Sequence, residues 1–81
     1  MIQDIINDIG LKLDLMNGRK EYRSLKKLYN DIQKGSSILR NVREFRNAIL
    51  KFPITSEKEN LIRNELLNLL QQLDNRLTRN I

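Results

Sequence analysis

Basic side chains are the residues of this sequence whose type and spacing best suit a chemical task. Ten of the fifteen Lys and Arg residues lie between Arg19 and Lys51, where only three acidic residues accompany them. This stretch therefore has a net charge of +7, whereas the whole chain has +5. Clustered positive charge attracts anions, either the phosphates of nucleic acid or the carboxylates of an acidic protein.

Other kinds of site chemistry find little support. The chain has no His and no Cys, which removes the commonest general base, the thiolate nucleophile and most zinc sites. Asp4 and Asp8 share one helix face, as two metal ligands would, but a solvated acidic flank at a helix N-terminus is the better explanation. Ser36 and Ser37 lack a base and suit a helix cap, and the three glycines are too scattered for a phosphate-binding loop. We therefore expect that the protein is not an enzyme and that it binds no cofactor or metal.

Length and composition indicate one small domain, residues 1–81. Without cysteines there are no disulfides, which suits a reducing cytoplasm. The N-terminus has no uninterrupted apolar run typical of a secretory signal, and no segment approaches the roughly 20 apolar residues of a membrane span. We therefore expect a cytoplasmic protein.

Apolar residues recur at spacings of three and four, which is typical of amphipathic helices. Gly18, Gly35 and Pro53 provide stops between them. The predicted helices are 2–16, 19–34, 37–51 and 56–80. Because the connections have two to five residues, neighbouring helices should be antiparallel. The sequence predicts an all-α, compact antiparallel four-helix arrangement.

Each predicted helix has one apolar stripe for the core. The main stripe residues are Ile2, Ile5, Ile6, Ile9, Leu13, Met16, Tyr22, Leu25, Leu28, Tyr29, Ile32, Ile38, Val42, Phe45, Ile49, Ile62, Leu66, Leu69, Leu70, Leu73 and Leu77. Gly10 lies inside the first helix, at a cost of about 1 kcal/mol relative to Ala. The two tyrosines lie on the apolar face, which favours packing over base stacking.

The last helix is predicted to be the longest. Ser56 and Glu59 have the spacing of a capping box, and no breaker follows them. Its length of about 37 Å exceeds the roughly 22 Å of its neighbours. Either its end frays or a second copy of the chain covers it. For packing or a dimer contact the candidate residues are Leu61, Leu67, Leu70 and Leu77.

The exposed sides of the second and third helices carry the candidate partner-binding residues. These are Arg19, Arg23, Lys26, Lys27, Arg40, Arg43 and Arg46. They could serve solubility alone, non-specific nucleic-acid binding, or contact with an acidic protein or an anionic membrane surface. The arginines are not accompanied by a cluster of Gln, Asn or Ser at the start of a helix, which would indicate that a recognition helix reads DNA bases. We favour a protein partner that the chain binds or inhibits, with non-specific nucleic-acid binding as the alternative.

Several short segments resemble pediocin-like (class IIa) bacteriocin immunity proteins. They are 28–32 (Leu-Tyr-Asn-Asp-Ile), 51–52, 55–56, 61–64 and Leu67. The resemblance implies a cytosolic antiparallel four-helix bundle that protects a bacteriocin producer at the membrane-embedded mannose-transporter receptor. The Leu-Tyr-Asn-Asp segment starts later here than in that family, and the family's C-terminal tail has no counterpart. A phage- or plasmid-encoded inhibitor of a host protein would share these features.

Overall fold

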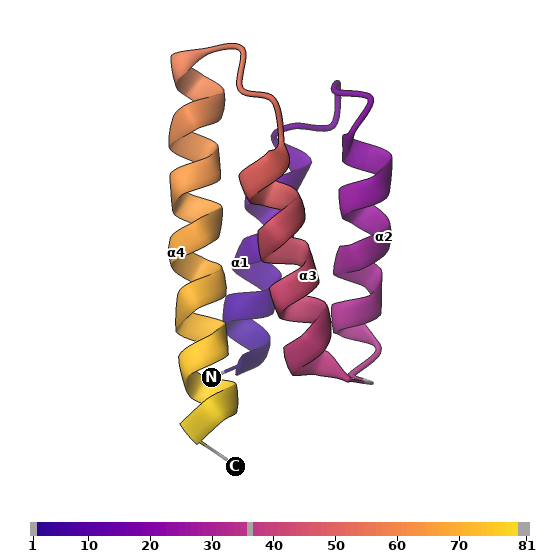
Figure 1. Cartoon of the computed structure of the whole chain (residues 1–81), viewed down its shortest axis with the longest axis vertical. Helices are drawn as coiled ribbons and strands as arrows, with labels where there is room; N and C mark the ends of the chain where they lie inside the picture. Colours follow the sequence, from indigo (N-terminus) through magenta and orange to yellow (C-terminus); the bar gives the residue numbers. More distant parts are fainter. Residues whose placement is uncertain (1, 36, 80–81) are drawn as a thin grey trace.

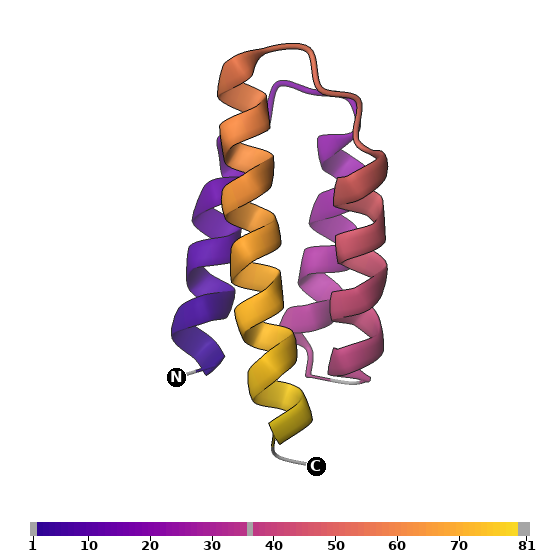
Figure 2. The ribbon, with the colours of Figure 1, turned by 60° about the vertical axis from the view of Figure 1, so that its left-hand side comes forward.

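A computed structural model describes residues 2–35 and 37–79. Its four helices are α1 (Ile2–Asp14), α2 (Tyr22–Gln33), α3 (Ile38–Lys51) and α4 (Glu57–Arg79). Each helix runs antiparallel to the next, and α4 returns to lie beside α1 (Figure 1). The pairs α1/α4 and α2/α3 therefore form opposite flanks of the bundle (Figure 2). The predicted all-α antiparallel four-helix fold is confirmed.

The core lies between the four helices and is built from the predicted stripes. Its buried apolar residues are Ile5, Ile6, Ile9, Leu13, Met16, Leu25, Tyr29, Ile32, Val42, Phe45, Ile49, Phe52, Ile62, Leu66, Leu70 and Leu73. Burying one such side chain fully stabilises the fold by about 1.5–3 kcal/mol. Phe45 of α3 is the largest of the fully buried side chains.

Helices α1 and α2 meet closely at Gly10. The hydroxyl of Tyr29 crosses Gly10 and donates a hydrogen bond of 2.9 Å to the carbonyl oxygen of Ile6. A Cβ atom at position 10 would lie only 2.8 Å from Cζ of Tyr29. Glycine is therefore required by the approach of the tyrosine ring, and the buried hydrogen bond offsets part of its propensity cost. The packing role predicted for Tyr29 is confirmed.

The connection between α1 and α2 is longer than predicted. Helix α1 ends at Asp14 and α2 begins at Tyr22, instead of at residues 16 and 19. The chain tightens here because the N–H group of Met16 bonds to Leu13, three residues back, at 2.9 Å. Met16 nevertheless remains in the core. Gly18 does not have the left-handed backbone expected of a helix stop, so that prediction was wrong.

The remaining helix ends follow the sequence signals with one exception. Gly35 has a positive φ of 78° after α2, as a helix-terminating glycine should. Phe52 is extended before Pro53, because proline disfavours helical geometry in the residue before it. Ser37 was expected to cap α3, but its side chain makes no cap hydrogen bond because the residue is itself left-handed, with a φ of 49°. Ser36 lies outside the described residues.

Helix α4, with 23 residues, is the longest and extends past the ends of its neighbours (Figures 1 and 2). Of the leucines proposed for packing or a dimer, Leu70 is fully buried, and Leu67 and Leu77 pack against the chain's own core. Leu61 alone among them is mostly exposed, at 57%. The predicted end at residue 80 lies outside the described part. No helix in residues 2–35 and 37–79 combines the length and apolar character needed to cross a membrane.

Candidate functional site: a basic hollow on α2

The predicted cations of α2 gather around a surface hollow of about 780 Å³. Its walls come from the α1–α2 connection and from the outer side of α2. The lining residues are Asn17, Arg19, Lys20, Tyr22, Arg23, Lys26, Lys27 and Asn30. Four of the seven predicted partner-binding residues are therefore brought together here, whereas the three on α3 lie elsewhere.

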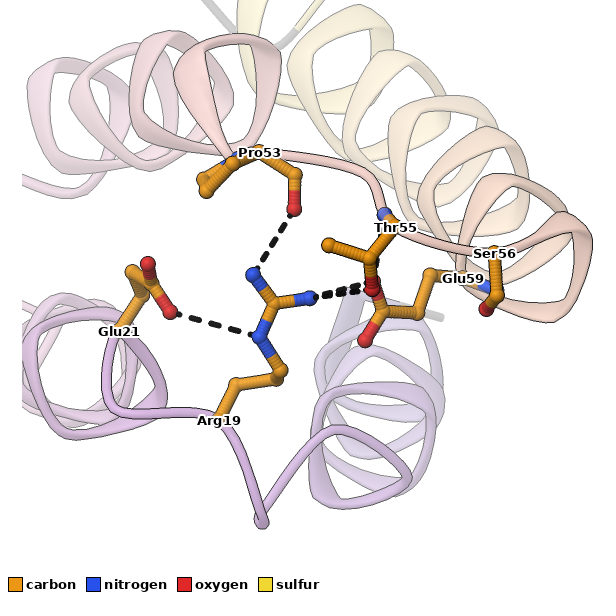
Figure 3. A network of polar contacts seen from close by, with 6 residues as sticks. All are labelled: Arg19, Glu21, Pro53, Thr55, Ser56 and Glu59. Carbon is orange, nitrogen blue, oxygen red and sulfur yellow. Dashed lines mark hydrogen bonds and ion pairs between the residues drawn. The ribbon is translucent and has the colours of Figure 1, made fainter.

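Arg19 links this wall to the connection between α3 and α4 (Figure 3). Its guanidinium donates hydrogen bonds to the Glu59 carboxylate at 2.5 Å, to the Pro53 carbonyl at 3.0 Å and to the Thr55 hydroxyl at 3.1 Å. It also lies 4.8 Å from the centre of the Phe52 ring, as in a cation–π contact. These contacts use the guanidinium to join two connections, so Arg19 shapes the hollow more than it offers a free charge.

The carboxylate of Glu59 is the main acidic partner in this network. Arg19 and, to a smaller degree, the backbone N–H and hydroxyl of Thr55 stabilise its charged form and lower its pKa to about 2. The Glu59 N–H donates a hydrogen bond of 3.2 Å to the Ser56 hydroxyl oxygen, which is the expected N-cap contact. The second half of the predicted capping box is shifted by one residue, because the Glu59 carboxylate accepts the N–H of Thr55 at 3.1 Å.

Lys26 is partly engaged with α1. Its Nζ lies 3.4 Å from Oδ1 of Asp14, and the same oxygen accepts a hydrogen bond of 2.6 Å from the hydroxyl of Tyr22. The tyrosine bond and then the lysine charge lower the pKa of Asp14. The pKa of Tyr22 is raised, mainly by its hydrogen bond to Asp14. A hydroxyl held in this way is a poorer general base, so the cluster is better suited to holding the helices together.

Lys20, Arg23 and Lys27 are the cations of the hollow that remain free for a partner. All three are exposed, and none makes a hydrogen bond or ion pair with another residue in the described part of the chain. We call them the free α2 cations, although Lys20 lies in the connection just before α2. Lys20 was not among the predicted site residues. Its position next to Arg19, on the same connection, was the available signal.

The basic residues of α3 are separated from the hollow, and two of the four are paired with acidic side chains. Nε of Arg43 lies 3.4 Å from Oδ2 of Asp74 on α4, and Nε of Arg40 lies 3.7 Å from Oε1 of Glu44. Arg46 is exposed, and no ion pair joins it to any residue in 2–35 or 37–79. The basic stretch of the sequence thus becomes two separate basic surfaces, one around the hollow on α2 and one on α3.

The described residues contain no group of three or more Asp or Glu side chains placed to hold a metal ion. No family model matches the chain, and no curated protein or solved structure is significantly similar to it.

Proposed function

We propose that this protein is a non-enzymatic binding protein that holds an acidic segment of a protein partner in the basic hollow on α2. The observation that supports this proposal is the arrangement of the free α2 cations. They share one concave surface with Lys26, whereas acidic neighbours compensate Arg40 and Arg43 on α3.

The chemistry of the free α2 cations suits carboxylates. Arg23 can bind a carboxylate through two parallel hydrogen bonds. Lys20 and Lys27, on either side of it in the sequence, add positive charge that speeds the encounter with an acidic surface. A hollow surrounds a short segment on more than one side, so apolar parts of Tyr22 and the lysine stems can contribute contact area.

Nucleic acid is the competing partner. Non-specific binding to a duplex depends on many simultaneous phosphate contacts, and would use a broad basic surface across α2 and α3. Pairing of Arg40 and Arg43 with Glu44 and Asp74 interrupts such a surface. This favours a compact acidic protein segment.

Bacteriocin immunity is a specific form of the proposal. The four-helix fold agrees with the architecture implied by the resemblance to pediocin-like immunity proteins. In that case the acidic segment would belong to a membrane-associated receptor complex, and the protein would act from the cytoplasm.

The decisive binding experiment compares two triple variants with equal loss of charge. Lys20→Ala/Arg23→Ala/Lys27→Ala removes the free α2 cations. Its control is the triple replacement by Ala of the exposed residues Arg46, Lys51 and Lys58. Binding of a synthetic Asp/Glu-rich peptide is measured by calorimetry and by NMR shift mapping at physiological salt.

The hollow variant should lose roughly 10- to 100-fold in affinity, if each exposed charge contributes up to about 1 kcal/mol. The control should lose less than about threefold, and the NMR shifts should map to the hollow. Equal losses in the two variants would contradict the proposal. Duplex DNA that binds more tightly than the peptide at the same salt would favour the nucleic-acid alternative.

The bacteriocin-immunity hypothesis is tested separately by a protection assay. The wild type and both triple variants are expressed in a bacteriocin-sensitive strain and challenged with a panel of pediocin-like bacteriocins. Protection by the wild type and the control, but not by the hollow variant, is expected. Unchanged sensitivity to the whole panel would reject immunity without affecting the peptide result.

A further inference from the structure

The flank formed by α1 and α4 exposes apolar side chains that the core does not use. Leu11 of α1 and Leu15, in the turn directly after α1, are 68% and 56% exposed, and Leu61 of α4 is 57% exposed. Leu11 and Leu15 line a groove of about 640 Å³ together with Leu69, and Asp8, Lys12 and Glu65 contribute its polar lining. Apolar groups gathered in this way on a small protein mark an interaction surface.

The three exposed leucines belong to one end of this flank. Lys12 of α1 and Glu65 of α4 form an ion pair of 2.6 Å, which fixes the two antiparallel helices side by side. Leu15 follows Lys12 by nearly one turn and Leu61 precedes Glu65 by one turn. Because the helices run in opposite directions (Figure 2), both leucines lie toward the same end of the bundle.

We infer that this α1/α4 flank binds the same flank of a second copy of the chain. A symmetric dimer contact must be complementary to itself, so that residue i meets j while j meets i. Asp8 and Lys12 satisfy this condition because they have opposite charges and are one turn apart on α1. When two α1 helices pair antiparallel, each Asp8 faces Lys12 of the second copy, and the two Leu11 side chains lie near the twofold axis.

The mixed charge of the groove also argues against a strongly charged partner. A basic segment would meet Lys12, and an acidic segment would meet Asp8 and Glu65. The second copy instead presents both signs in the reciprocal places. One long side of the bundle measures 38 by 20 Å, so nearly the whole flank would be used to bury the roughly 800 Å² per partner of a standard interface.

Such a dimer would carry two basic hollows, and their joint effect on partner binding rests on the proposed function. The α1/α4 flank lies opposite the α2/α3 flank, so pairing through α1 leaves both basic hollows facing outward. Two hollows on one particle would bind a partner with repeated acidic segments more tightly than one hollow does.

Sedimentation equilibrium of the whole chain tests the association directly. The wild type should reach twice its mass of 9.6 kDa with increasing concentration. Leu11→Lys/Leu15→Lys should raise the dissociation constant at least about tenfold, because two apolar contacts are lost. Leu50→Lys is the matched control, since Leu50 is a similarly exposed leucine of α3, at 51%, and it should leave the constant unchanged.

The register is tested with single cysteines, which the chain naturally lacks. Oxidised Leu11→Cys should form a covalent dimer rapidly, whereas Leu50→Cys should remain mostly monomeric. Asp8→Lys should weaken association, because it places like charges opposite each other in both halves of the contact.

A wild type that remains at 9.6 kDa up to millimolar concentration would overturn the inference. So would a dimer that Leu50→Lys disrupts and Leu11→Lys/Leu15→Lys does not. Circular dichroism of each variant verifies that it is folded. Acidic-peptide affinity per chain should be equal in monomeric and dimeric variants, so failure of the dimer would not affect the test of the basic hollow.

Discussion

Acidic side chains pair with Arg40 and Arg43 on the outer side of α3, whereas Arg23 and Lys27 on the outer side of α2 have no such partner among the described residues. The two helices otherwise have a similar design, since they contain 12 and 14 residues and each buries three side chains of its own stripe. Lys26 of α2 and Lys34 at its C-terminal end are paired as well, so each helix has two basic residues without an ion pair to a described residue: Arg23 and Lys27 on α2, and Arg46 and Lys51 on α3. The difference between the helices is therefore one of position, because only the unpaired cations of α2 line the basic hollow.

The inner sides of the two helices are also held differently. Helix α3 places Phe45 at the centre of the core, where many neighbours surround it. Helix α2 packs against α1 through Tyr29 at Gly10, a crossing without room for one more carbon atom. This close contact, together with the contacts of Tyr22 and Lys26 with Asp14, sets how α2 and its basic hollow lie against α1.

Among the substitutions that test the difference between α2 and α3, Gly10→Ala should have the largest effect on stability. Overpacking costs about 1–3 kcal/mol and better helix propensity returns about 1 kcal/mol, so we expect a net loss of up to about 2 kcal/mol. Urea denaturation measures this loss. NMR shifts should change along α2 and around the hollow more than along α3.

Gly18→Ala is the matched control for this replacement. A Cβ atom at position 18 meets nothing within 4 Å, and we expect a change within about 0.5 kcal/mol. The cost of Gly10→Ala should also be smaller in a Tyr29→Phe background, which lacks the crossing hydroxyl. An equal cost in both backgrounds would show that the tyrosine hydroxyl is not the obstacle.

A smaller loss of stability is expected from Glu59→Gln, which removes the acidic partner of Arg19 and leaves the cations of α3 unchanged. The pKa of Glu59 is about 2 in the fold, below its ordinary value of 4.5. Its charged form therefore stabilises the fold fully above about pH 4.5, and this contribution disappears as the pH falls towards 2. The stability difference between the wild type and Glu59→Gln should be greatest near neutral pH and vanish near pH 2.

Urea unfolding curves between pH 7 and pH 2 measure this difference. Glu57→Gln is a control in the same turn, because Glu57 is exposed and has no ion pair with any described residue. It should follow the wild type at every pH. A Glu59→Gln curve that stays parallel to the wild type down to pH 2 would contradict the proposed role of the Arg19 contact.

Local signals in the sequence predicted the helices, their inner stripes and the side on which the basic residues lie. Hydrophobic spacing identifies these features because the helical period alone determines which residues share a face. The end of α1 was less predictable, since the chain tightens at Met16 without a proline or a left-handed glycine. Gly10 seemed only a cost until the ring of Tyr29 was seen to cross it.

Long-range pairing could not be inferred from spacing. Arg19 looked like one more exposed cation, but it meets Glu59 forty residues later. Arg43 is paired with Asp74 across two helices. Lys20 was overlooked because nothing in its own surroundings shows that it remains free. The candidate site thus required the fold, although four of its five cations came from the predicted set.

The smallest effect is expected when the arginines of α3 are released. Glu44→Gln/Asp74→Asn removes the acidic partners of Arg40 and Arg43, and so extends the available basic surface from α2 to α3. Affinity for a 20-base-pair duplex at low salt should rise roughly threefold to tenfold, since exposed ion pairs contribute about 0.2–1 kcal/mol each. Fluorescence anisotropy measures the change.

Affinity for the acidic peptide should stay within about twofold, because the free α2 cations are unaltered. Asp4→Asn/Glu57→Gln gives the same change in net charge away from α3 and should produce a smaller gain for DNA. If both double variants gain equally, net charge rather than the pairing of the α3 arginines governs nucleic-acid binding, and the distinction between α2 and α3 would lose its functional meaning.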